Sequence, residues 1–142
     1  MGRHGSKMKH SLITRRLMVA TLGLGALGLT HAQARIDSES VTLEVARKEL
    51  ESGTSRVIDI REPQEHAGGV APGVQLLPMR QLAGRISEIP NDPKQPVLLI
   101  CNTQNRSSAT WKYLREKGYT NVRFVQGGMS EWTRRAWPLV KP

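Results

Sequence analysis

The stretch VLLICNTQNRSS, residues 97–108, decides the fold and contains the most reactive side chain of the sequence. Its four branched apolar residues, 97–100, follow a proline and predict a buried strand. Residues 107–117 predict a helix that ends at Gly118. Cys101, the single cysteine among 142 residues, stands between the two. The sequence therefore places a nucleophile where a strand gives way to a helix.

The polar segment between this strand and this helix has the pattern C-x4-R, from Cys101 to Arg106. Backbone N–H groups at the start of a helix bind anions and stabilise a thiolate, and Arg106 adds a permanent positive charge near the sulfur. Alternatively, Cys101 packs as an inert small hydrophobe, which its polar loop argues against. We expect Cys101 to be a nucleophile directed at a small anion.

The elements predicted around this stretch alternate between strands and helices. Strands are predicted at 56–61, 75–77, 97–100 and 121–125, and helices at 43–52, 79–89, 107–117 and 129–135, with Ser40 or Thr42 as the cap of the first helix and a turn over 62–73. Strands joined by single helices require a parallel sheet with helices on both faces. The predicted fold class is therefore α/β, and ligands of such sheets bind beyond the carboxyl ends of the strands, where Cys101 falls.

The first 34 residues have the composition of an export signal. They contain five basic residues and no acidic one, followed by a weakly apolar run over 17–29 that is too short and too rich in glycine to span a membrane. Ala32-Gln33-Ala34 predicts a cleavage site, so we expect a signal peptide over 1–34 and one domain over 35–142. The segment around Arg15 and Arg16 resembles a twin-arginine signal, although paired arginines also occur in ordinary export signals. The expected location is periplasmic or secreted, and an uncleaved membrane anchor is the alternative.

Composition excludes several classes of function for the predicted domain. Its 16 Lys and Arg against 12 Asp and Glu give a net charge of +4, where the whole chain carries +9, and no basic stripe with interleaved aromatics indicates nucleic-acid binding. Three of the four histidines lie in the leader, so only His66 remains and no Cys/His cluster predicts a metal site. A single cysteine forms no internal disulfide, and the fold must depend on packing.

Several motifs together make the chain after the leader resemble the single-domain rhodaneses, a sulfurtransferase family. These motifs are VIDIRE over 57–62 with Glu65, GVAPG over 69–73, the loop 101–107, Gly118-Tyr119, Asn121-Val122, Gly127-Gly128 and Trp132. The resemblance implies an open parallel sheet of about five strands flanked by helices on both faces. We expect no cofactor, and no metal because the predicted domain has no Cys/His cluster. Two positions depart from the family pattern: Val70 stands where His is common, and Gln104 stands where Gly is common.

The activity implied by the resemblance is sulfur transfer from thiosulfate or a similar anionic donor to cyanide or a thiol. Cys101 would carry the sulfur as a persulfide, and Asn102, Thr103, Gln104, Asn105, Arg106 and Ser107 would hold the anionic substrate. In another interpretation Arg106 points outward or braces the loop. Because Gln104 replaces a glycine, we expect strain from a positive φ at that position. The partners are then a small donor and acceptor, or a protein acceptor, with no nucleic acid and no membrane once the leader is removed.

Two other functions are compatible with a cysteine in such a loop. Related phosphatase and arsenate-reductase loops have the pattern C-x5-R, because a tetrahedral oxyanion needs a wider ring of donors, so the shorter loop disfavours them. A non-catalytic persulfide carrier or sensor is the alternative from another class. We expect Asp59 and Arg61 to pair and brace the loops, and His66 to serve packing or the surface rather than proton transfer. Trp111, Trp132 and Trp137 are expected to pack.

Overall fold

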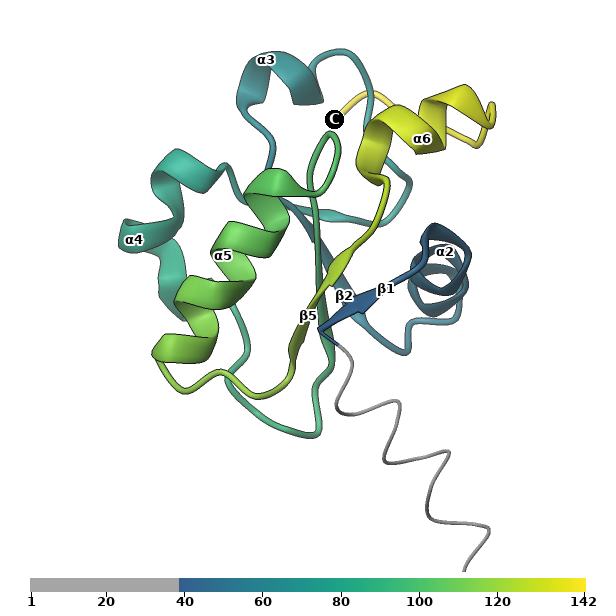
Figure 1. Cartoon of the computed structure of the whole chain (residues 1–142). Helices are drawn as coiled ribbons and strands as arrows, with labels where there is room; N and C mark the ends of the chain where they lie inside the picture. The colour runs from purple at the N-terminus through teal and green to yellow at the C-terminus, as the bar shows by residue number, and fades with distance from the viewer. Residues whose placement is uncertain (1–38) are drawn as a thin grey trace, which may run out of the picture.

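The protein is described by a computed structural model over residues 39–142 (Figure 1). The predicted signal peptide, its cleavage site and the start of the predicted domain lie outside the described residues. Within 39–142, no helix combines the length and apolar character that crossing a membrane requires.

Five parallel strands form one sheet in the order β1-β5-β4-β2-β3. The strands are β1 (Ser40–Val41), β2 (Arg56–Asp59), β3 (Gln75–Leu76), β4 (Val97–Ile100) and β5 (Val122–Val125). The helices are α2 (Leu43–Glu51), α3 (Pro63–His66), α4 (Leu82–Arg85), α5 (Asn105–Glu116) and α6 (Gly128–Arg134), with 3₁₀ turns η1 (Met79–Gln81) and η2 (Ile86–Glu88) on either side of α4. The central strand is β4, which pairs with β2 and β5, so the loop that follows it lies at the middle of the sheet.

The two faces of the sheet are covered by different helices, α4 and α5 on one side and α2 and α6 on the other (Figure 1). Successive residues of β4 supply the two cores alternately, because side chains of a strand alternate between faces. Leu99 and Cys101 pack with Leu114 of α5, whereas Leu98 and Ile100 pack with Trp132 of α6. This two-sided burial accounts for the uninterrupted apolar run of β4.

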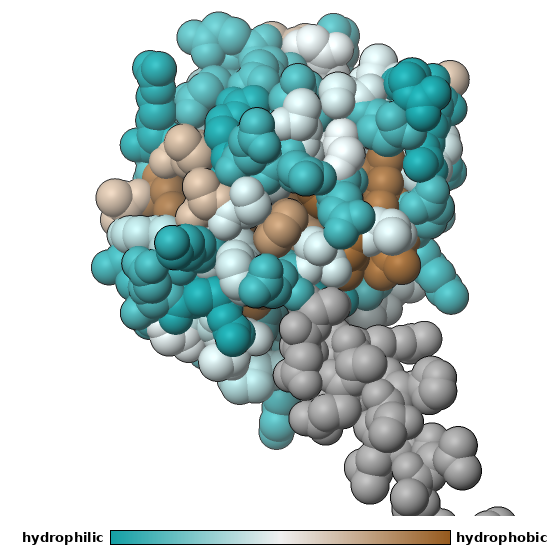
Figure 2. Space-filling view, viewed as in Figure 1, coloured by the Kyte–Doolittle hydropathy of each residue, from teal (hydrophilic) through white to brown (hydrophobic). Residues whose placement is uncertain are grey.

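Most of the surface in the view of Figure 2 is hydrophilic, and the apolar side chains visible there are confined to small areas. The exposed large hydrophobic side chains of the described residues are Val45, Met79, Tyr113, Leu139 and Val140. Two of them belong to the C-terminal segment, where Val140 forms an antiparallel bridge with the buried Val70.

The predicted fold class is confirmed, and the main differences concern short elements. The segment 79–89, predicted as one helix, is divided into η1, α4 and η2, with Gly84 in the middle and Arg85 leaving helical geometry at φ −124°. Of the two predicted caps of the first helix, Thr42 is the cap, whereas Ser40 lies in β1, which the sequence did not predict. The turn predicted over 62–73 contains the single-turn helix α3. Other predicted elements differ from the observed ones by one or two residues at their ends.

Candidate active site

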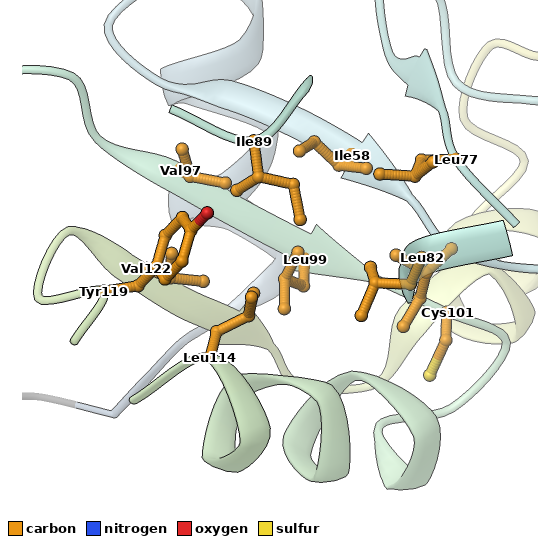
Figure 3. Close-up of a cluster of buried hydrophobic side chains, with 11 residues drawn as sticks. Ile58, Leu77, Leu82, Ile89, Val97, Leu99, Cys101, Leu114, Tyr119 and Val122 are labelled. Atoms are coloured by element: carbon orange, nitrogen blue, oxygen red, sulfur yellow. The ribbon is translucent and has the colours of Figure 1, made fainter. Parts of the chain in front are cut away.

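Cys101 directly follows β4 at the carboxyl edge of the sheet, and its side chain is buried, with a residue exposure of 1%. Figure 3 shows its sulfur directed toward the first turn of α5, beyond Leu82. The backbone N–H of Ser107 donates to Sγ at 3.4 Å, and the thiol lies 3.4 Å from the Ser107 hydroxyl oxygen, to which it can donate. The Ser107 hydroxyl in turn donates to the carbonyl of Gln104 at 3.1 Å. Cys101 is therefore held by a residue at the start of a helix, as the sequence predicts.

The start of α5 leaves backbone donors unused. The first N–H groups of a helix have no partner within the helix. The residue before α5, Gln104, caps none of them with its side chain, and the first intrahelical bond of this end runs from Ser108 to Gln104. The N–H groups of Asn105 and Arg106 meet no acceptor within residues 39–142. Since the helix dipole also favours negative charge at this end, the start of α5 is suited to an anion.

The loop 101–106 is held from its other side by α6. The N–H groups of Met129 and Ser130 donate to the carbonyls of Cys101 and Asn102 at 2.8 and 2.9 Å. In a trans peptide the carbonyl and the next N–H point in opposite directions, so the N–H groups of Asn102 and Thr103 point away from α6. The packing requires a glycine at 128, because a Cβ there would lie 2.3 Å from the Thr103 carbonyl oxygen and 2.4 Å from that of Cys101.

The helix α3 holds the loop through an ion pair that the sequence did not predict. Nη1 and Nη2 of Arg106 donate to the two carboxylate oxygens of Glu65, each at 2.7 Å. Glu65 also accepts from the N–H of Glu62, and together they form the capping box of α3. The hydrogen bond from Arg106, opposed by partial burial, lowers the pKa of the Glu65 carboxyl to about 2. Arg106 braces the loop, as one of the two interpretations of this residue expected.

Beneath α3, a buried charged cluster fixes the end of β2. Arg61 donates to both carboxylate oxygens of Asp59, at 2.7 to 3.1 Å, and to the carbonyl of Gly69 at 3.0 Å. Nε2 of the buried His66 lies 3.3 Å from Oδ1 of Asp59 without the geometry of a hydrogen bond. The expectation that Asp59 and Arg61 brace the loops is confirmed, and His66 is a packed residue of α3 that faces this cluster.

The structure places Cys101, Asn102, Thr103 and Gln104 in the loop after β4 and Asn105, Arg106 and Ser107 in the first turn of α5, and it overturns one expectation about them. Asn102, Thr103, Gln104 and Asn105 are exposed, Arg106 is half-buried and Ser107 is buried. The expectation of strain from a positive φ at Gln104 is wrong, because the φ of this residue is −154°. The Gln104 amide oxygen instead accepts from the N–H of Gly127 at 3.4 Å, across the loop. Glutamine therefore fits this backbone without a left-handed conformation.

Two features of the site are not predicted by the sequence analysis, although a sequence pattern points to each of them. The pair of Glu62 and Glu65 around Pro63 is the pattern of a capping box, which would have predicted α3 and a fixed carboxylate near the site. Gly127-Gly128 was identified only as part of the family resemblance, whereas both glycines have positive φ and Gly128 also provides the close approach to the loop. Val70, the other departure from the family pattern, is buried and pairs through its backbone with Val140.

Within residues 39–142 there is no group of three His, Cys, Asp or Glu side chains that could hold a metal ion. The packing expected of the tryptophans is seen: Trp132 is buried, Trp111 packs against Phe124, and Trp137 lies edge-on to Trp132 with its ring centroid 4.9 Å away.

Known proteins share both sequence and fold with this chain. Residues 42–135 match the Rhodanese-like domain family. A protein of Allochromatium vinosum named Sulfurtransferase is 37% identical over 107 residues, which cover 75% of this chain and 94% of the relative. The fold is similar to the crystal structure of a rhodanese-related protein from Thermoplasma volcanium, with a TM-score of 0.65, 25% identity, and coverage of 73% of this chain and 99% of that one.

A thiosulfate sulfurtransferase from Pseudomonas aeruginosa shares the fold over 76% of this chain and 21% of its own length, with a TM-score of 0.63 and 24% identity. The match to the family spans most of the described residues and includes the strand, loop and helix around Cys101. The chain belongs to the rhodanese-like domain family of sulfurtransferases.

Proposed function

We propose that this protein transfers sulfane sulfur from thiosulfate or a similar anionic donor to cyanide or a thiol through a persulfide on Cys101. The observation that carries the proposal is the position of Sγ, 3.4 Å from the N–H of Ser107 at the uncapped start of α5. The sulfurtransferase relative, which is 37% identical to this chain over 107 residues, supports the same class of reaction.

The chemistry needs only the thiolate and an anion-binding environment. The Cys101 thiolate attacks the outer sulfur of thiosulfate, a new S–S bond forms, and the S–S bond of thiosulfate breaks so that sulfite leaves with the electron pair. Cyanide then attacks the outer sulfur of the persulfide, thiocyanate leaves, and the thiolate is restored. No external oxidant or reductant is consumed. The unused N–H groups of Asn105 and Arg106 would stabilise the negative outer sulfur, as an oxyanion hole stabilises oxygen.

The other loop residues act around this centre in the proposal. Asn102, Thr103 and Gln104 form the exposed rim that the donor meets first, and Arg106 supplies positive charge. Ser107 contacts the sulfur directly. Because Cys101 is almost wholly buried, a non-catalytic persulfide carrier or sensor is the second candidate, in which sulfur is stored for a protein partner and small molecules turn over poorly.

Mass spectrometry of the intact protein tests the proposal. Thiosulfate should add one sulfur atom and cyanide should remove it, and Cys101→Ser should abolish both changes because the chain has no other thiol. An undiminished adduct in that variant would contradict the role of Cys101. Steady turnover with thiosulfate and cyanide distinguishes the enzyme from the carrier, since a carrier loads sulfur once but turns over slowly.

We also propose, from the sequence alone, that the protein is exported and that its mature form begins at Arg35 in the periplasm or outside the cell. Sequencing the N-terminus of the protein from its native host tests this. Full-length protein in the cytoplasm would count against export. If the twin-arginine route is used, the double change Arg15→Lys and Arg16→Lys should block it.

A further inference from the structure

The Arg106–Glu65 ion pair joins two elements that are 41 residues apart in sequence. Arg85–Glu88 and Arg134–Glu131 each join residues three positions apart within one helical stretch, whereas Arg123–Glu49 and Arg135–Glu44 also join distant elements, but away from the catalytic loop. Arg106 and Glu65 are only about one-third exposed, at 30% and 34%, and meet with two parallel hydrogen bonds. Such two-pronged contacts fix the direction of the guanidinium as well as its position.

The orientation of this pair leaves part of Arg106 available. A guanidinium carries five N–H donors, and Glu65 takes one from each terminal nitrogen. Within residues 39–142, Nε of Arg106 meets no acceptor. Arg106 directly precedes Ser107, whose backbone N–H donates to Sγ of Cys101 at 3.4 Å, so the charge of Arg106 lies at the same end of α5 as the sulfur. The edge of Arg106 that includes Nε can therefore bind a second anion while Glu65 stays in place.

Glu65 is itself anchored on both sides. Its carboxylate accepts from the backbone N–H of Glu62, and the next residue, His66, packs against the buried Asp59–Arg61 pair. The low pKa of Glu65, about 2, keeps its carboxylate ionised above about pH 4. The helix α3 thus offers a fixed negative group to a residue of the active-site loop.

We propose that Glu65 is a positioning residue for sulfur transfer: it holds Arg106 so that the free edge of its guanidinium faces an anionic sulfur donor at Cys101. This inference rests on the proposed function. Glu65 does not touch the donor in this arrangement and acts only through Arg106. Its loss should weaken donor binding more than it slows the chemical step.

The test measures thiosulfate KM and kcat, at saturating cyanide, for the full chain and its variants. Glu65→Gln keeps the shape of the side chain but offers one acceptor in place of two, so Arg106 loses its two-pronged contact. We expect KM to rise about three- to tenfold with kcat within about twofold, which is the pattern of lost binding rather than lost chemistry. An unchanged KM would overturn the proposal. A lower KM would also overturn it, because Glu65 would then compete with the donor for Arg106.

A double-mutant comparison shows whether Glu65 acts through Arg106. In an Arg106→Ala background, Glu65→Gln should change KM no further. A persisting effect would contradict positioning through Arg106. The matched control is Glu49→Gln, which breaks another long-range ion pair, Arg123–Glu49, away from the catalytic loop. This control should alter thermal stability without altering KM.

The kinetics of Glu65→Asp and the sulfur loading of the unaltered protein complete the test. Glu65→Asp retains the charge but is one methylene shorter, so it should raise KM as well, and it replaces Glu65→Gln if the latter does not fold. Sulfur loading of the unaltered protein, followed by mass, separates this inference from the function on which it rests. If the unaltered protein loads no sulfur, both fail. If it loads sulfur and both Glu65 variants keep its KM, the positioning role alone fails.

Discussion

The helices α2 and α5 begin in opposite ways, and the difference marks the site. At α2 the hydroxyl of Thr42 accepts from the N–H of Val45 at 3.4 Å, and Thr42 has the extended geometry of a cap, with ψ 162°. At α5 the preceding residue, Gln104, has ψ −6° and gives no side-chain cap. The N–H of Ser107 turns to the sulfur of Cys101 instead. At α5, one of the donors that a structural helix gives to its own cap thus meets the sulfur of Cys101, and those of Asn105 and Arg106 meet no acceptor within residues 39–142.

The contact with α6 holds the loop that leads into α5, and Gly128→Ala would break this contact. The added Cβ would meet the Thr103 and Cys101 carbonyl oxygens at 2.3 and 2.4 Å, at a φ of +55° that disfavours side chains. We expect a loss of about 3 kcal/mol of unfolding free energy from overpacking and left-handed strain. Sulfur loading should also fall strongly. Denaturant unfolding and mass spectrometry measure the two effects.

The control for this change is Gly84→Ala, because a Cβ at Gly84 meets no atom within 4 Å and its φ is not positive. That variant should be as stable as the unaltered protein, or more so, with unchanged sulfur loading. Equal behaviour of the two alanine variants would refute the requirement for glycine beside the loop.

The hydroxyl of Ser107 contributes to the special start of α5, and Ser107→Ala removes it while leaving the backbone donor to Sγ. Once Cys101 is a thiolate it can only accept, so the Ser107 hydroxyl would donate to Sγ in place of the Gln104 carbonyl, and the loss of this hydrogen bond of about 1 kcal/mol should slow sulfur loading about fivefold. The neighbouring Ser108 donates to the carbonyl of Asn105 and does not contact the sulfur, so Ser108→Ala serves as the control. Loading with thiosulfate, quenched at successive times and followed by mass spectrometry, compares the rates of the two variants. Identical rates in the two variants would exclude a role for the Ser107 hydroxyl.

At α2 the same kind of change should affect stability alone. Thr42→Ala removes the cap and should cost about 1 kcal/mol, which lowers the melting temperature by about 4–8 °C in a domain of this size. The rate of sulfur loading at a temperature well below melting should be unchanged. A slower rate would show that α2 is coupled to the site and would weaken the contrast between the two helices.

Among the residues of the catalytic loop, the smallest effect on transfer is expected at Gln104. A strained residue would gain from glycine, but φ is −154° here and no strain is present to relieve. Gln104→Gly should therefore leave the rate of sulfur transfer within about twofold and lower stability by about 0.5–1 kcal/mol, through greater freedom of the unfolded chain. Rate and melting measurements on the same sample test both parts. A rate increase of tenfold would restore the strain hypothesis.

The starts of α2 and α5 also differ in how far local sequence predicts them. Thr42 lies in a local pattern, a polar residue before an apolar helical run, and its role follows from that spacing. The strand 97–100, the parallel α/β class and the reactive position of Cys101 also follow from local pattern. By contrast, the prediction of one helix over 79–89 is wrong. The spacing of Leu82, Ile86 and Ile89 is compatible with a series of short helical turns as well as with one continuous helix.

Local sequence predicts four of the five strands, most of the helices between them and the cysteine at the end of the central strand, because alternation, capping and turn signals act over a few residues. The groups that surround Cys101 follow only from the tertiary structure. The partner of Arg106 lies 41 residues away on α3, and the support of the loop comes from α6 through a glycine that no neighbouring residue specifies. These contacts depend on how distant segments converge at one edge of the sheet, and local spacing does not encode that convergence.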